Sequence, residues 1–137
     1  MRDTLKPGLT LTRKLVVDRP RTIDFLGEEL RVYATPELVR DFEIACRDLL
    51  LQHADANEDS VGVGISVTHG GATLLGMSVE VTAEVTAVDG RMVKFKVSAR
   101  DDIEPVSQGE HTRAVVDVGK LRTRVQVQAK AAKAKSA

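Results

Sequence analysis

The sequence predicts an α+β fold in which an antiparallel sheet wraps around one long helix. Three observations support this prediction. Residues 35–53 show the spacing of apolar side chains that is typical of a half-buried helix. Residues 77–88 and 92–100 instead alternate between apolar and polar side chains, as half-buried antiparallel strands do. Asp89-Gly90 between these two segments is a strong signal for a two-residue hairpin.

The predicted helix has a well-signalled start. Thr35 can accept hydrogen bonds from the first free amides, and Pro36 suits the first helical position because its missing N–H costs nothing there. At about 100° per residue, the apolar side chains fall on one arc and most charged ones on the other. Glu43 is the exception, because it lies on the rim of the apolar arc beside Val39 and Leu50. We therefore expect a half-buried carboxylate at this position.

One strand precedes the helix and the others follow it, which predicts a strand, a helix and then an antiparallel meander. Residues 9–17 alternate loosely and form the first strand. Residues 19–34 contain helix and strand breakers, and we expect a connection with a helical turn around Phe25. Residues 104–118 form the last strand. Such a sheet leaves its edge strands unpaired, so we expect a homodimer formed by edge pairing, with higher oligomers left open.

The segment at residues 61–71, VGVGISVTHGG, carries an apolar face and a glycine-rich face. Val61, Val63, Ile65 and Val67 share the apolar face, and His69 continues their register. If this face packs on the helix, His69 points toward the helix at the end of its strand, where we expect Glu43.

Composition and charge exclude several classes of protein. Acidic and basic residues are equal in number at 20 each, so we expect no nucleic-acid partner and no membrane partner. The single cysteine, Cys46, lies on the apolar arc of the helix and is expected to fill core space. No segment is suited to secretion or membrane spanning, which predicts a soluble, cytoplasmic protein. The three histidines lack metal-ligand spacing, so we expect no metal and no cofactor.

The order of these elements is that of the hotdog fold, and four segments narrow the comparison further. With YATPELVRDFEIAC, VGVGISVTHGGATLLGMSVEVTAEV, VDGR and SQGEHTRAVV, the chain resembles the fluoroacetyl-CoA thioesterase family over roughly residues 9–120. The spacings from Thr35 to Glu43 and from Gly62 to His69 agree with the family pattern. We therefore expect a single hotdog domain at residues 1–120. Residues 121–137 are a basic tail whose alanine, lysine and serine leave little to bury, so we expect a short helical or extended piece after Gly119 and then disorder.

The resemblance also implies a catalytic set of Thr35, Glu43 and His69 that hydrolyses an acyl-CoA thioester, with Gly62 and Arg113 binding substrate. Thioester hydrolysis requires a nucleophile or a base, a donor for the developing oxyanion and help for the leaving thiolate. A half-buried Glu43 suits the role of base or nucleophile, and His69 can donate to the substrate or carry a proton near neutral pH.

Each of these residues also has a structural explanation. Thr35 can be an ordinary N-cap, and Glu43 can pair with Arg47 one turn later, which contributes only about 0.3–0.5 kcal/mol. His69 can be a strand-end histidine bonded to backbone. Gly62 can serve strand packing alone, and Arg113 can be a solvent-facing partner of an acidic neighbour, Glu110 or Asp117.

The predicted function is therefore hydrolysis of a small or medium acyl-CoA to the free acid and CoA. The alternative is a non-catalytic hotdog module that binds CoA esters or another small acyl ligand. A hotdog hydratase is a third possibility, but the helix shows no Asp–His motif for it. The family's lid is longer and richer in aromatics than residues 22–34 here, which offer only Phe25 and Tyr33, so the fluoroacetyl specificity is not carried over.

Overall fold

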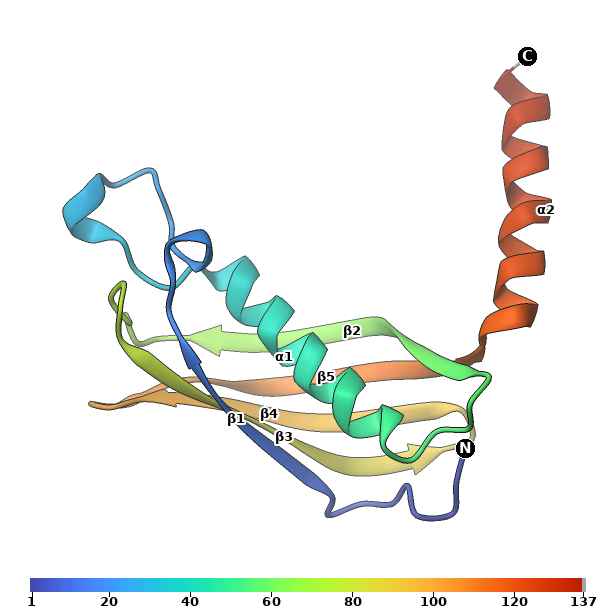
Figure 1. Ribbon diagram of the computed structural model, residues 1–137, viewed down its shortest axis with the longest axis horizontal. Coiled ribbons are helices and arrows are strands. Elements are labelled where there is room, and N and C mark those ends of the chain that lie inside the picture. The colour runs from blue at the N-terminus through green and yellow to red at the C-terminus, as the bar shows by residue number, and fades with distance from the viewer. Residues whose placement is uncertain (137) are drawn as a thin grey trace.

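The computed structural model describes residues 1–136 of the chain, which fold into one curved sheet, a central helix and a projecting C-terminal helix (Figure 1). Two short 3₁₀ helices, at Arg19–Arg21 and Glu28–Leu30, lie in the connection that precedes the central helix. In chain order the main elements are β1 (Thr10–Val16), α1 (Thr35–Leu51), β2 (Glu58–His69), β3 (Ser78–Asp89), β4 (Met92–Asp101), β5 (Pro105–Asp117) and α2 (Val118–Ser136).

The strands form one antiparallel sheet in the order β1-β3-β4-β5-β2, which curves around α1. The predicted α+β class, with an antiparallel sheet around one long helix, is confirmed. The predicted meander is correct only for β3, β4 and β5. β2 pairs with β5 at the far edge, while β1 lies beside β3. No tight hairpin turn joins β2 to β3 through residues 70–77, so β3 lies on the opposite side of the sheet from β2, next to the edge strand β1.

The β3–β4 hairpin forms where Asp89-Gly90 predicts it, but its two loop residues begin one position later. Asp89 pairs with Met92, which leaves Gly90 and Arg91 as the two loop residues, and Gly90 has a φ of 58°. Glycine adopts this left-handed conformation without steric cost. The polar faces meet as predicted, with Glu84 opposite Lys96 on the outer side of the sheet.

The hydrophobic core lies between α1 and the concave face of the sheet. Cys46 is fully buried there, as predicted, and burial raises the pKa of its thiol to about 12. The side chains that fill this space are at most 1 % exposed; they include Leu38, Phe42, Ala45, Leu49 and Leu50 from α1 and Val79, Val81, Ala83, Val85, Val93, Phe95 and Val97 from β3 and β4. The buried arc of α1 thus matches the helical pattern in the sequence.

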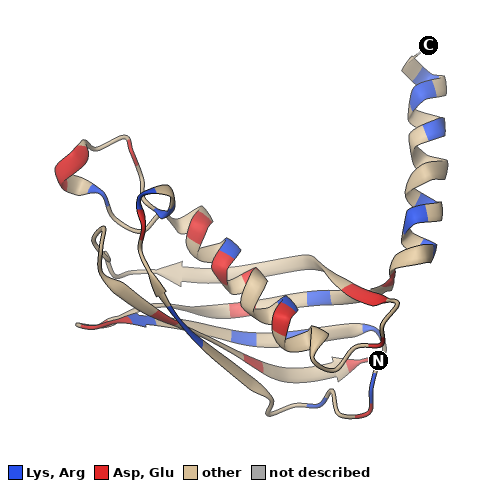
Figure 2. Cartoon of the chain, in the orientation of Figure 1, with Lys and Arg blue, Asp and Glu red and all other residues tan. Residues whose placement is uncertain are grey.

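Residues 118–136 form α2, where the sequence predicts a short helical or extended piece followed by disorder. Alanine, lysine, arginine and glutamine are strong helix formers, which explains the helix. None of its side chains is buried, and it projects away from the sheet with basic but no acidic residues (Figure 2). The structure therefore differs from the predicted disorder; residue 137, also part of that prediction, lies outside the described residues. Within the described residues, no helix is both long and apolar enough to cross a membrane.

Candidate active site

Thr35 and His69 meet where α1 begins and β2 ends. The Oγ1 atom of Thr35 lies 2.7 Å from Nδ1 of the His69 imidazole. Ala34 is the N-cap of α1, so Thr35 is the first helical residue and Pro36 the second. The predicted N-cap role of Thr35 is therefore wrong. Its hydroxyl is directed to a side chain of the sheet, and the two residues form a hydroxyl–imidazole pair.

The His69 ring packs against Tyr33, and one of its nitrogens has no hydrogen-bond partner in residues 1–136. The two rings meet edge to face, with their centroids 6.1 Å apart and an interplanar angle of 79°. The Nε2 atom of His69 is buried and has no hydrogen-bond partner among residues 1–136. Burial lowers the pKa of His69 from its ordinary value, so the imidazole is neutral at neutral pH. When the Thr35 hydroxyl donates to Nδ1, the ring proton is on Nε2, which then offers a buried N–H to a bound molecule.

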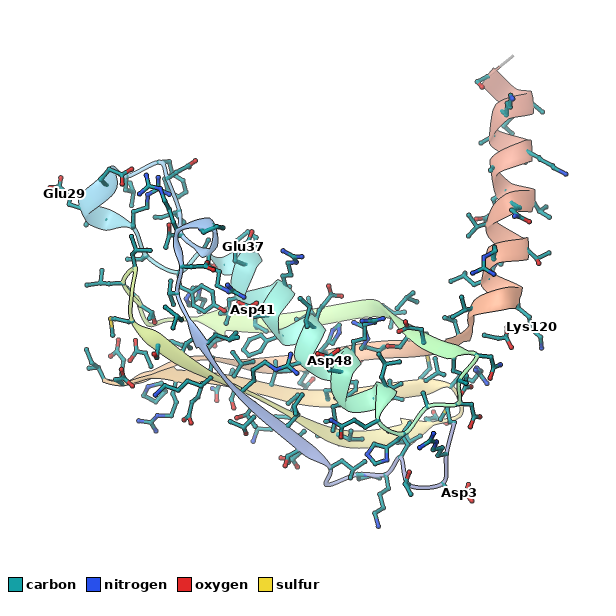
Figure 3. The ribbon with its side chains drawn as sticks, in the orientation of Figure 1. Asp3, Glu29, Glu37, Asp41, Asp48 and Lys120 are labelled. Atoms are coloured by element: carbon teal, nitrogen blue, oxygen red, sulfur yellow. The ribbon has the colours of Figure 1, made fainter. Side chains whose placement is uncertain are left out.

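Tyr33 is itself fixed by a buried carboxylate of α1. Its hydroxyl donates to Asp41, which is only 8 % exposed and is labelled in Figure 3. Arg21 donates to the same carboxylate through Nε at 2.9 Å and Nη2 at 3.2 Å. Burial and the neighbouring Asp41 raise the pKa of Tyr33, so its hydroxyl remains a donor. These bonds fasten the β1–α1 connection to α1 and keep the Tyr33 ring against His69.

Glu43 lies farther along α1, above Gly62 of β2. A Cβ atom added to Gly62 would overlap Oε1 of Glu43, so the carboxylate approaches β2 only because the residue beneath it is glycine. The side chain of Glu43 is 43 % exposed, as its place on the rim of the helix predicts. Arg47 does not pair with Glu43 but binds Asp59, at 2.6 and 2.9 Å. The structural explanation of Glu43 by a pair with Arg47 is thus excluded.

Arg113 of β5 lies beside Glu43 and is 5 % exposed. Its Nη1 is 3.5 Å from Oε1 of Glu43. Its Nε donates to the hydroxyl of Ser60 at 2.7 Å, and its Nη2 donates to the Ser60 carbonyl at 2.9 Å. The alternative of a solvent-facing Arg113 is therefore excluded. Because Gly62 is its cross-strand partner, the structure brings Glu43, Gly62 and Arg113 together.

A β-bulge in β2 determines which residues of this strand face α1. Gly62 pairs with Arg113, but Gly64 pairs with Thr112, so Val63 is an extra residue without a partner on β5. An extra residue of this kind reverses the alternation of side chains beyond it.

The bulge puts Gly62 and His69 on the same face, although they are an odd number of residues apart. Gly62 is opposite the buried Arg113, and His69 is opposite the buried Ser107. The prediction of one continuous apolar face from Val61 to His69 is therefore wrong. Val61 lies before the bulge, is turned away from α1 and is 42 % exposed.

One protomer does not bring all five predicted site residues together. Thr35 and Glu43 are eight positions apart on α1 (43 − 35), which corresponds to about 12 Å along the helix axis. The expectation that His69 meets Glu43 in one chain is wrong, because His69 reaches the start of the helix and meets Thr35. The site residues therefore form two groups, which we call the histidine group (Thr35 and His69) and the glutamate group (Glu43, Gly62 and Arg113).

Sequence reasoning missed four residues that support these groups: Tyr33 and Asp41 at the histidine group, and Ser60 and His111 at the glutamate group. The strand alternation contained a signal for His111, because it is two residues from Arg113 and must share its face. No comparable signal marks Asp41, whose buried position depends on the arginine of a distant connection. Among residues 1–136, no cluster of three or more His, Cys, Asp or Glu side chains has the arrangement to bind a metal ion.

Comparisons with known proteins agree with this fold. The sequence model of a family described as fluoroacetyl-CoA-specific thioesterase matches residues 17–119. The chain is 34 % identical to the fluoroacetyl-CoA thioesterase of Streptantibioticus cattleyicolor over 132 residues, which cover 91 % of this chain and 95 % of the relative.

Two solved structures are similar in fold. One is a threonine-to-serine variant of a fluoroacetyl-CoA enzyme in complex with acetyl-CoA, with a TM-score of 0.82 and 31 % identity, covering 90 % of this chain and 98 % of the other. The other is a hot-dog-like protein from Thermanaerovibrio acidaminovorans, with a TM-score of 0.82, 24 % identity and coverages of 89 % and 91 %. The hotdog fold predicted for this chain is thereby confirmed.

Proposed function

Because the chain belongs to the fluoroacetyl-CoA-specific thioesterase family, we propose that it hydrolyses the thioester of a small or medium acyl-CoA to the free acid and CoA. The catalytic set is Thr35, Glu43 and His69, and Gly62 and Arg113 bind substrate. The observation that carries the proposal is the half-exposed Glu43 carboxylate, seated on a glycine and beside a buried guanidinium. The structure with acetyl-CoA is that of a similar protein and supports an acyl-CoA as the ligand class.

Glu43 supplies the attacking group in this proposal. Its carboxylate either attacks the thioester carbonyl or removes a proton from the water that does so. Gly62 leaves the space that the Glu43 carboxylate occupies above β2. Arg113, fixed by Ser60, presents a positive charge on the same side as the developing negative charge.

His69 and Thr35 act on the other side of the carbonyl. The buried Nε2–H of His69 donates to the carbonyl oxygen or to the leaving thiolate, which satisfies a group that has no partner in residues 1–136. Thr35 determines the ring tautomer by donating to Nδ1. In this proposal the glutamate group supplies the attack, and the histidine group supplies the donor for the carbonyl oxygen or the leaving thiolate.

A homodimer assembles these two groups in our proposal. β2 is an edge strand, and Val61, Val63 and Ile65 expose apolar side chains along it. In a twofold dimer with antiparallel β2 strands, the end of one strand lies beside the beginning of the other. The partner subunit's His69 would then approach Glu43, which lies above Gly62 near the beginning of β2.

Thiol release from a panel of acyl-CoAs, including acetyl-CoA, fluoroacetyl-CoA and longer and branched esters, tests the proposed activity. The wild type should hydrolyse at least one member, and Glu43→Ala should lose about 10²- to 10⁴-fold in kcat. Glu80→Ala, which removes an exposed carboxylate of β3, is the matched control and should keep full activity. Near-full activity of Glu43→Ala contradicts the assignment. Saturable CoA-ester binding without thiol release in the wild type favours the non-catalytic module.

A further inference from the structure

His111 is a buried histidine on β5, two residues before Arg113. It is 1 % exposed, and its ring stacks on Phe95 with a centroid separation of 6.3 Å and an interplanar angle of 28°. Its Nδ1 lies 2.8 Å from the carbonyl oxygen of Gly64, and its Nε2 lies 3.1 Å from Nη1 of Arg113. Both ring nitrogens therefore have a polar partner inside the protein.

The chemistry of these partners fixes the tautomer of His111. A backbone carbonyl only accepts hydrogen bonds, so the proton must be on Nδ1. A guanidinium only donates, so Nε2 must be unprotonated and accept from Arg113. The ring is thus neutral, with its free lone pair directed at the guanidinium.

The bond to His111 completes the fixation of Arg113. Ser60 accepts from Nε and Nη2, and His111 accepts one of the two protons on Nη1. The guanidinium is planar, so the second Nη1 proton is then directed away from His111, on the side where Oε1 of Glu43 lies at 3.5 Å. The Cε1 atom of His111 also lies beside Gly62, 3.3 Å from where a Cβ atom on that residue would be.

We infer that His111 is a positioning residue for the thioesterase reaction: as a neutral acceptor it orients Arg113, which in turn orients the Glu43 carboxylate above Gly62. The inference rests on the proposed function, since it assigns a role within that same site.

The surroundings of His111 favour its neutral form. The charged groups that face it are Arg113 on its own strand and Glu43 on α1, while β4 contributes Phe95 and β2 contributes the Gly64 carbonyl. Burial, together with the positive charge of Arg113, lowers the pKa of His111 from its ordinary value. A protonated ring would direct an N–H at the guanidinium and lose the bond to Nη1.

Three substitutions separate the hydrogen bonds of His111 from its packing. His111→Gln places an amide oxygen near the former Nε2 and can still accept from Arg113. His111→Asn keeps a donor near the former Nδ1 for Gly64 but has no acceptor for Arg113. His111→Phe keeps the stacking on Phe95 and has neither group. The readout is thiol release from an acyl-CoA that the wild type hydrolyses, with melting temperature measured for every variant.

The positioning role predicts that His111→Asn and His111→Phe lose about tenfold in kcat with little change in KM, because His111 itself does not touch substrate. His111→Gln should lose less than about threefold. In an Arg113→Ala background, the three substitutions should have equal and small effects on kcat, since the group that they orient is gone. His53→Asn, at a histidine bonded to Thr4 far from this site, is the control and should leave kcat unchanged.

Unchanged kcat in a folded His111→Asn or His111→Phe overturns the positioning role, and so does a loss that is equally large with and without Arg113. If the wild type releases no thiol from any ester, the proposed function itself fails, and this role fails with it. Thiol release by the wild type together with unchanged kcat in the variants overturns the positioning role alone.

Discussion

The two ends of β2 hold their polar side chains in different ways. In the histidine group, His69 has one hydrogen bond, to Thr35, and a ring contact, and its Nε2 is without a partner in the described chain. In the glutamate group, Arg113 donates two hydrogen bonds to Ser60 and one to His111, in addition to its contact with Glu43. In the proposed mechanism, the histidine that donates to the substrate keeps one ring nitrogen free, whereas the arginine beside the glutamate is held by three hydrogen bonds within the protein.

The largest expected effect comes from removing one member of each group in separate chains. Glu43→Ala and His69→Ala should each lose about 10²- to 10⁴-fold in kcat. When equal amounts are unfolded together and refolded, half of the dimers are mixed and each mixed dimer has one complete site. Thiol release should therefore recover to about a quarter of the wild-type rate. A mixture as inactive as its components would mean that the two groups do not meet across a dimer.

Alanine substitutions at two glycines of β2, Gly62 and Gly64, should have different effects on kcat. Gly62→Ala puts a methyl group into the space that Glu43 occupies, so the carboxylate must move and kcat should fall about 100-fold. Gly64→Ala meets no atom within 4 Å and should leave kcat unchanged. Thiol-release kinetics and melting temperatures of both variants provide the measurement. Equal effects of the two substitutions would contradict a specific role for the contact at Gly62.

The single hydrogen bond between Thr35 and His69 should contribute less to kcat than the contact at Gly62. Thr35→Val removes the hydroxyl that determines the His69 tautomer and should lower kcat about three- to tenfold, whereas Thr35→Ser keeps the hydroxyl and should stay near the wild type. The ratio of the two kcat values is the measurement. If Thr35→Val is as active as Thr35→Ser, the Thr35–His69 bond is structural only.

The smallest expected effect concerns stability and pH, and here the two groups behave alike. Burial lowers the pKa of both His69 and His111 in the folded state, so the unfolded chain binds more protons as the pH falls through the ordinary histidine range. The free energy of unfolding should therefore decrease as the pH falls below about 6.5. Urea unfolding at a series of pH values measures the slope, and the His69→Gln, His111→Gln double variant should flatten it. An unchanged slope in that variant would contradict the assignment to these histidines.

Local periodicity predicted much of the fold and less of the site. The buried arc of α1 and the β3–β4 hairpin followed from side-chain spacing and from Asp89-Gly90, because both depend on neighbours in sequence. The position of β2 at the far edge did not, since strand order depends on contacts between distant segments.

The five site residues came from the resemblance to a family, and their division between two ends of β2 was not predicted. Strand alternation alone places Gly62 and His69 on opposite faces, because a bulge leaves no mark in the hydrophobic pattern. Asp41 illustrates the same limit. Its charge predicts exposure, and only the long-range contacts with Tyr33 and Arg21 explain its burial.

The extra residue at Val63 makes the length of β2 as important as its composition. Deleting any one residue from Gly64 to Thr68 would leave the bulge in place, yet it would turn the imidazole of His69 toward the outer surface while every side chain of the site remained in the sequence. Insertions and deletions between Gly64 and His69 should therefore be far less tolerated than substitutions at Val63, whose side chain is 54 % exposed. The side-chain alternation of β2 beyond its bulge therefore decides whether His69 reaches the candidate site.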